Sequence, residues 1–443
     1  MNEETDLKSS QISVLQGWPQ FAEHELRAEI LGEMHARPFE KIDVPRRVFL
    51  MAFITTAEQS QRDRDAIGKL CRVHGLAPPA AESNYHSVQI DKWHLRWERH
   101  NEFTTYRWDV TEADEVEFAG EGVSRLLSEL EFQPPGELLV ATQLKITKVK
   151  REMADYEQIF NPASICFIGT DRGKARVVTD FQADLHGFTR FIIEDHGMSP
   201  FRAGALVQRV LEVETYRTLA LMGFPAAKKA MPFVNQVQDR LASLTTEIAE
   251  AESMEDNHQL LRTLTDLAAE LEAQAAKTAF RFSASQAYNQ IVLSRLNAMN
   301  EEPIEGARRF SSFFRRRLEP AMATCRMVEE RQGMLSRKLM RTAELLRTRI
   351  QFELEQQNRV VLSSMNRRAS LQLRLQQTVE GLSVAAVSYY VVGLLKYIFE
   401  GAEKSGVLFG LSPTLLTGLS VPLIITLVWM VTRRIHHKFK EKD

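Results

Sequence analysis

The pattern of apolar and polar positions changes twice along the 443-residue chain. Up to about residue 225, short apolar or alternating runs are separated by polar turns, as in strands mixed with helices. From residue 230 the apolar positions recur at steps of three and four, which predicts long amphipathic helices. Beyond residue 380 two runs are apolar enough to cross a bilayer. The pattern predicts an α/β cytosolic domain, a helical coiled-coil stalk and a C-terminal two-helix transmembrane hairpin.

The first region, residues 1–225, contains seven predicted strands. They are Arg47–Thr55, Ser87–Arg99, Glu102–Val110, Glu137–Thr147, Ser164–Thr170, Lys174–Phe181 and Gly187–Asp195. Predicted helices cover residues 20–34, 57–74, 112–131 and 199–222, and the last begins with a Ser-Pro pair typical of a helix start. The segment Gly169–Ala175 resembles a phosphate-binding loop, but its glycine spacing is one residue short, so a hairpin turn is expected there.

The second region, residues 230–380, has two coiled-coil helices separated by the polar stretch SMEDN. A third helix is expected over Ser283–Asn300, followed by a break at Asn300–Gly306. No proline occurs between Pro320 and Pro413, and residues 321–380 are expected to form one helix of roughly 90 Å. An apolar stripe runs along this helix, and a monomer could not cover it, so a homo-oligomer is expected.

The third region, residues 381–432, contains two predicted spans, at about 381–399 and 409–431, followed by a basic cytosolic tail at 433–443. Arginines and lysines are concentrated before the first span and after the second. The loop between the spans contains Lys404 together with the acidic Glu400 and Glu403. Because basic residues favour the cytoplasmic side, both termini are expected in the cytosol. The first ten residues lack the features of a signal peptide.

Charge is distributed unevenly, although the net charge is −2. Residues 1–307 carry 33 basic and 47 acidic side chains, and residues 308–374 carry 16 basic and 6 acidic ones. Most of the basic block fits a solvated helix face, but its end and the tail adjoin the spans, where anionic headgroups attract basic residues. Headgroup contact is predicted for Arg367, Arg368, Arg374, Arg433, Arg434 and Lys438. The overall balance excludes a uniformly basic nucleic-acid binder.

Recognisable catalytic chemistry is absent from the linear sequence. The three cysteines, Cys71, Cys166 and Cys325, are far apart, which excludes a disulfide scaffold and a Cys-rich zinc module. None of the dinucleotide-binding, zinc-protease, hydrolase or kinase motifs occurs. The expectation is therefore a protein that is not an enzyme and needs no metal or cofactor.

Polar clusters nevertheless occur at three places: around residue 35, between residues 184 and 197, and on the helix at 199–222. The candidate residues are His35, Arg37, His186, Arg190, Glu194, Arg209, Glu212, Glu214 and Arg217. One interpretation is a ligand or anion pocket. The other interpretation is a set of ion pairs that joins helix to sheet. This interpretation is favoured because no nucleophile or metal-ligand cluster lies near these residues in the sequence.

Three segments resemble a bacterial family of predicted membrane-anchored proteins of unknown function, DUF3422: Glu25–Glu40, Leu185–Pro225 and Leu345–Tyr397. The resemblance covers essentially the whole chain. It implies a protein of the bacterial inner membrane and implies no activity.

The predicted architecture is also similar to that of CorA-type magnesium channels. Those channels carry a Gly-Met-Asn motif at the outer end of the first span, where this chain has Lys396–Lys404 without that motif. The favoured function is a membrane-anchored scaffold or sensor with an unidentified cytosolic protein partner. The alternative is a CorA-like channel or transporter with a divergent outer loop, and a third class is a hydrolase that uses the His/Glu clusters.

Overall fold

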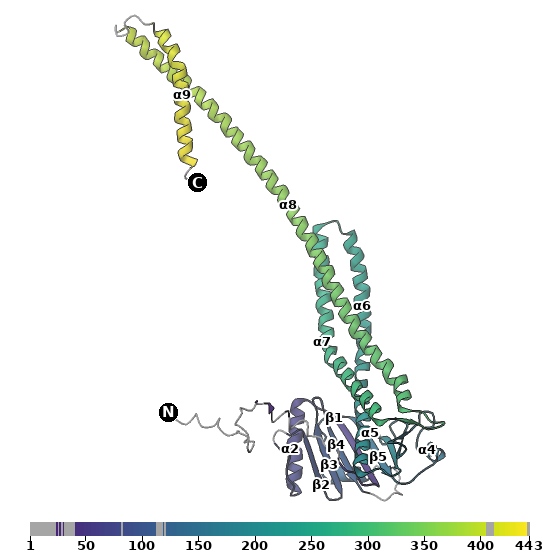
Figure 1. The fold of residues 1–443 in the computed structure, drawn as a ribbon. Helices are drawn as coiled ribbons and strands as arrows, with labels where there is room; N and C mark the ends of the chain where they lie inside the picture. The colour runs from purple at the N-terminus through teal and green to yellow at the C-terminus, as the bar shows by residue number, and fades with distance from the viewer. Residues whose placement is uncertain are drawn as a thin grey trace, which may run out of the picture. The chain divides into compact units, whose positions relative to one another are not determined.

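The computed structural model describes residues 24, 26–27, 30, 40–80, 83–111, 118, 121–404 and 412–440 (Figure 1). The chain divides into two compact units. The first unit combines Met1–Thr246 with Thr263–Arg341, and the second combines Glu247–Arg262 with Thr342–Asp443. The boundary predicted at residue 225 falls inside the first unit, which also includes residues 226–246 and 263–341 of the helical region.

A nine-stranded mixed sheet forms the centre of the first unit, in the order β2-β3-β4-β1-β5-β8-β7-β6-β9. β5 and β8 pair in parallel, and the other described pairs are antiparallel. The strands are β1 (Arg46–Ile54), β2 (Tyr85–Ile90), β3 (Trp93–Arg99), β4 (Phe103–Val110), β5 (Glu137–Thr147), β6 (Cys166–Thr170), β7 (Ala175–Thr179), β8 (Thr189–Asp195) and β9 (Glu302–Pro303).

Eight helices are described. They are α2 (Ala57–Val73), α3 (Glu121–Glu129), α4 (Met153–Ile159), α5 (Pro200–Leu221), α6 (Gly223–Glu250), α7 (Met254–Met299), α8 (Phe310–Lys404) and α9 (Pro413–Lys440). Ser199 caps α5 by accepting a hydrogen bond from the backbone N–H of Arg202, and Pro200 begins the helix, as its sequence predicted.

One face of the sheet carries the aromatic core of the first unit. Trp93, Leu95 and Trp97 of β3 lie on this face beside Tyr106 and Trp108 of β4. Alternate residues of a strand point to the same side, so the period-two pattern of these strands builds one continuous apolar surface. Helices α2 and α3 cover it and bury Ile67, Cys71 and Leu126 there.

Helix α5 covers the opposite face of the sheet. Its Gly204 approaches the chain at Glu40 so closely that a Cβ at this position would lie 1.8 Å from the carbonyl oxygen of Glu40. Ile42 donates a backbone hydrogen bond to the carbonyl of Pro200, at 3.0 Å. The segment at residues 40–42 is therefore held against the start of α5.

Several predicted elements need correction. Ser87–Arg99 forms two strands rather than one, because Asp91 adopts a left-handed conformation (φ 52°) and makes a tight turn with Lys92. The expected third coiled-coil helix is the end of α7, which continues unbroken to Met299. Helix α8 starts at Phe310, and Pro320 lies inside it rather than before it.

Other predictions are confirmed or fall outside the described residues. The turn at residues 171–173 joins β6 to β7, and Asp171, Arg172 and Gly173 all have positive φ there. Helix α4 was missed, because seven residues are too few for a clear apolar period. Most of the helix predicted at 20–34 and part of that at 112–131 lie outside the described residues.

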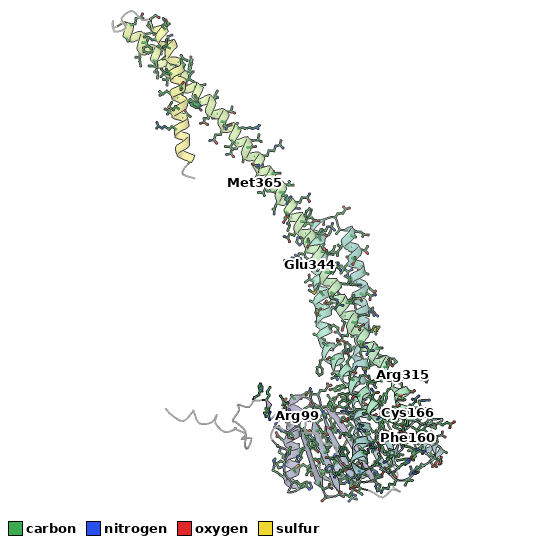
Figure 2. All side chains as sticks on the ribbon, viewed as in Figure 1. Arg99, Phe160, Cys166, Arg315, Glu344 and Met365 are labelled. Atoms are coloured by element: carbon green, nitrogen blue, oxygen red, sulfur yellow. The ribbon has the colours of Figure 1, made fainter. Side chains whose placement is uncertain are left out.

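Two helices in the described part of the chain are long and apolar enough to cross a membrane, within Phe310–Glu403 and at Pro413–Thr432. Only 6% of the most apolar stretch of each helix is buried. In the second unit, Arg349 of α8 donates to the carbonyls of Ile248 and Ala251 at the end of α6, at 3.1 and 2.8 Å. Met365, labelled in Figure 2, lies further along α8 and is 59% exposed.

Candidate functional site

The face of the sheet beneath α5 carries charged residues on β3 and β4. His94, Arg96 and Glu98 alternate with the apolar residues of β3, and Arg107 and Asp109 do the same on β4. In the register of the two strands, Arg96 stands directly opposite Arg107, and His94 opposite Asp109. The same alternation that builds the aromatic core therefore places an ionic array on the other side.

Glu40 joins this array from the segment held by α5. Its Oε1 accepts hydrogen bonds from the hydroxyls of Tyr85, at 3.0 Å, and Ser87, at 3.1 Å. Its Oε2 accepts a hydrogen bond from Nη2 of Arg107. Nη1 of Arg96 lies 3.9 Å from Oε1. Both carboxylate oxygens of Glu40 are therefore engaged by donors.

Asp109 is fully enclosed by the same array. Its Oδ1 accepts from Nη1 of Arg46 at 2.6 Å. Its Oδ2 lies 3.3 Å from both Nη2 of Arg107 and Nδ1 of His94. Burial alone would raise the pKa of the Asp109 carboxyl, but hydrogen bonding to His94 and the charges of Arg107 and Arg46 outweigh burial and lower it. The pKa of Glu40 is lowered in the same way, with Arg107 as the strongest opponent of burial.

Glu40, His94 and Asp109 bring three ligand atoms within 4.8 Å of one another, a spacing that a metal ion could use. Carboxylate and imidazole are suitable donors for several divalent ions. However, Arg46 and Arg107 already occupy oxygens of these carboxylates. A cation would have to displace guanidinium groups and share the site with their charge, so the chemistry favours an ion-pair network.

A pocket opens beside this network, between the charged face of the sheet and α5. Its sheet wall includes Arg96, Glu98, Thr105 and Arg107. Its helix wall includes Gln208, Glu212 and Tyr216. The cavity volume is about 70 Å³.

The walls of the pocket are held by a second layer of contacts. His100 stacks on Phe103, with ring centroids 4.1 Å apart. Glu212 accepts a hydrogen bond from the Gln208 amide at 2.9 Å and one from Nε of Arg295 on α7. Nε of Arg96 donates to Glu98 at 2.5 Å. The pocket is thus preformed, with cationic, anionic and aromatic groups in fixed places.

Glu194, predicted from the sequence, lies on the other face of the sheet, beneath α4. It is fully buried and accepts hydrogen bonds from Tyr156 Oη, at 2.5 Å, and from the backbone N–H of Arg151, at 2.9 Å. His196 Nε2 lies 3.1 Å away and Arg176 3.7 Å away. Burial and the neighbouring Glu194 raise the pKa of the Tyr156 hydroxyl. This is a closed ion-pair cluster.

The remaining predicted residues of the middle segment are dispersed. Glu214 and Arg217 form a two-bond ion pair on α5, at 2.5 and 2.6 Å. Arg190 donates to the carbonyl of Ile159 at 2.7 Å. His186 is exposed in a turn, and Arg209 makes no hydrogen bond with any described residue. Among the seven candidates in the described part of the chain, only Glu212 lines the pocket.

The other predicted positions lie at the two ends of the chain. His35 and Arg37 are outside the described residues. Arg367, Arg368 and Arg374 are exposed on α8, and Arg434 is exposed on α9. Arg433 and Lys438 belong to α9, and their side chains lie outside the description.

The sequence pattern did not single out Arg96 and Arg107 of the sheet wall. It also missed Asp109 and Glu40 of the ion-pair network beside it. A signal was available, because charges of both signs alternate with tryptophans along Trp93–Arg99 and Phe103–Val110. An alternating strand with a charged rather than merely polar face needs counter-charges on its neighbours. What the sequence does not provide is the register that sets two arginines opposite each other.

No curated protein matches the chain. The family described as "Protein of unknown function (DUF3422)" matches residues 22–439, which include all the strands and helices described above except the last residue of α9. The chain belongs to the DUF3422 family.

Proposed function

We propose that this protein is a membrane-anchored scaffold or sensor of the bacterial inner membrane, with its sheet unit in the cytosol. The observation that carries the proposal is the pair of C-terminal apolar helices, which expose large side chains such as Leu394, Leu423 and Trp429. A bilayer would cover these side chains, whereas water would not tolerate so large an apolar surface.

The orientation follows from the flanking charges. Arg367, Arg368 and Arg374 precede the first span, and a basic tail follows the second, so both flanks are assigned to the cytosol. Reporter fusions placed after Gly406 and after Asp443 test the hairpin. Opposite sides are expected for the two fusions, and the same side for both would reject it.

A role other than catalysis is supported by the state of the reactive groups. Cys71, Cys166 and Cys325 are all buried, and burial raises the pKa of the Cys166 thiol to about 12. A thiol with so high a pKa is a poor nucleophile. The carboxylates of Glu194 and Asp109 are occupied by donors. These features favour binding or assembly over hydrolysis.

The channel alternative depends on polar groups in the spans. Ser383, Thr417 and Ser420 each donate to a carbonyl of their own helix, at 2.7–2.8 Å. Such bonds satisfy the hydroxyl protons inside the helix, which favours an anchor over a water-lined pore. Cation flux into proteoliposomes is the direct test. Robust flux that a bulky substitution at Ser388 abolishes would overturn the scaffold assignment.

We further propose that a second copy of the chain covers the apolar stripe of α8. Ile350 of this stripe is 5% exposed beside the end of α6, whereas Leu354, one turn later, is 44% exposed. Val361, Met365 and Leu375 continue the stripe and are exposed as well. Arginines interrupt this segment, so it is unsuited to the hydrocarbon core of a bilayer. The identical stripe of a second copy would cover its apolar side chains.

The mass of the detergent-solubilised protein tests the oligomer. A multiple of the 50.6 kDa chain is expected, and the double variant Val361→Glu/Met365→Glu should reduce it. Ser363→Glu, on the opposite side of the helix, is the control and should leave the assembly intact. A wild-type protein of about 50.6 kDa alone would reject the proposal.

A further inference from the structure

The pocket between α5 and the sheet brings two like charges together, although Glu98 and Glu40 pair with them. Arg96 and Arg107 stand directly opposite each other on neighbouring strands and are only 2% and 6% exposed. Like charges in directly opposed positions destabilise a sheet. Local rules of this kind are broken mainly at functional sites. The opposed arginines therefore indicate a place built to receive negative charge.

Arg107 of the sheet wall also has one N–H group that no described residue accepts. Nε of Arg107 is buried and has no hydrogen-bond partner among the described residues, although the side chain is only 7% exposed. A guanidinium presents its N–H groups in a planar fork that matches the two oxygens of a carboxylate. A carboxylate at this wall would find both charge and geometry.

The helix wall offers the opposite charge. Glu212 of α5 faces the pocket between Gln208 and Arg295, from which it accepts hydrogen bonds, and its side chain is 22% exposed. A carboxylate is an acceptor for an ammonium group, and the Gln208 amide is a further polar partner. Leu50, Phe103 and Tyr216 supply apolar surface in the same pocket. A ligand that spans the pocket therefore meets cations at one end and an anion at the other.

The size of the pocket suits a small ligand. A cavity of 70 Å³ accommodates several water-sized groups, and glycine, alanine and serine are small enough to enter it.

We propose that this pocket binds a small zwitterion of amino-acid size, with its carboxylate at Arg96 and Arg107 and its ammonium group at Glu212. A simple anion would meet Glu98 and Glu212 in the same pocket, and a metal ion would meet the two arginines. A molecule with both charges satisfies both walls. The binding site is independent of the membrane topology proposed above.

Calorimetric titration of the full-length protein in detergent tests the inference. Glycine, alanine and serine are the probes, and acetate and methylammonium are the matching half-molecules at equal ionic strength. At least one amino acid is expected to bind saturably with a Kd below about 10 mM. Each half-molecule is expected to bind with an affinity at least about tenfold lower.

Two variants locate the site. Glu212→Gln keeps the shape of the side chain and removes its charge, and should weaken binding of the amino acid about tenfold or more. Gln208→Met leaves the contact of Glu212 with Arg295 in place and should weaken binding less. Glu157→Gln, on the exposed side of α4, is the control and should bind as the wild type does.

Three results would overturn the inference. Titrations without saturation for all three amino acids would show that the pocket takes no such ligand. Acetate that binds as tightly as alanine would make it a plain anion site. Unchanged affinity in a Glu212→Gln variant whose circular dichroism matches the wild type would place the ammonium group elsewhere.

Discussion

One buried aspartate lies on each face of the sheet at strands β3 and β4. The two aspartates differ in the residues that surround them. On the aromatic face, Asp63 of α2 accepts hydrogen bonds from Nε1 of Trp97, at 2.8 Å, and from the hydroxyl of Tyr106. On the charged face, Asp109 accepts from Arg46 and lies beside Arg107 and His94. Both side chains are almost completely buried.

The comparison teaches that burial alone does not set the behaviour of a carboxyl group. Burial raises the pKa of Asp63, and the two neutral donors offset only part of that rise. At Asp109 the cationic neighbours more than reverse the same effect. The charged face therefore gains from ionisation of its aspartate, and the aromatic face loses from it.

The largest expected effect is that of Asp109→Ala. The substitution leaves Arg46 and Arg107 without a shared counter-charge, so the first unit should lose about 3–5 kcal/mol of unfolding free energy at pH 7. Urea unfolding followed by the fluorescence of the buried tryptophans measures the loss. Glu58→Ala, which removes an exposed pair with Arg62, is the control and should cost under about 1 kcal/mol. A similar loss of unfolding free energy in the two variants would show that the charged array does not stabilise the first unit.

A smaller loss is expected from Gly204→Ala. The new methyl group would meet the carbonyl oxygen of Glu40, so α5 or the Glu40 segment must shift, at a cost of about 1–3 kcal/mol. The shift would loosen the contacts of Glu40 with Arg107. Thermal unfolding measures the cost, and Gly333→Ala is the control because its Cβ would meet only the end of a flexible arginine. An unaltered melting temperature for Gly204→Ala would show that α5 does not close the charged face.

The smallest change and the sharpest contrast are expected from Asp63→Asn. Asp63 has a raised pKa in the folded state, so its contribution favours folding at low pH and is lost as pH rises above its ordinary value of 3.8. Asparagine removes that penalty, and the stability at pH 7 should change by only about 1 kcal/mol.

The pH dependence of unfolding distinguishes the two faces. Asp109 has a lowered pKa, so its contribution is present above the ordinary value of 3.8 and is lost as pH falls below it. Asp109→Asn should flatten the acid side of the stability profile, whereas Asp63→Asn should steepen it. The same change of slope for both variants would disprove the contrast.

The elements of the fold followed from the sequence more fully than their arrangement did. Glu137–Thr147 was predicted with the observed bounds, because its apolar run is long and its ends are marked by turn residues. The order of the strands was not predictable, since the parallel pairing of β5 with β8 depends on contacts between distant segments. Asp91 was misread because the alternating pattern continues through the turn without a glycine.

The candidate site was less accessible from the sequence than the fold. Glu212 was identified because the helical spacing places it on one face with Arg209 and Tyr216. Its partner Arg295 lies 83 residues away, and Glu40 lies 67 residues from Arg107. Pairs at such separations leave no local pattern, and only the register of β3 and β4 reveals that two arginines share a wall.

The short strand β9 has a consequence for synthesis of the protein. It adds to the edge of the sheet at β6, and Thr170 donates a hydrogen bond to the carbonyl of Met299, 129 residues later in the chain. Phe181 packs against Phe310 and Phe313 across a similar interval. Contacts so far apart in sequence slow folding, and during translation the sheet edge stays open until the whole α6–α7 hairpin has left the ribosome. Completion of the sheet thus waits for a segment that follows both helices of this hairpin in the chain.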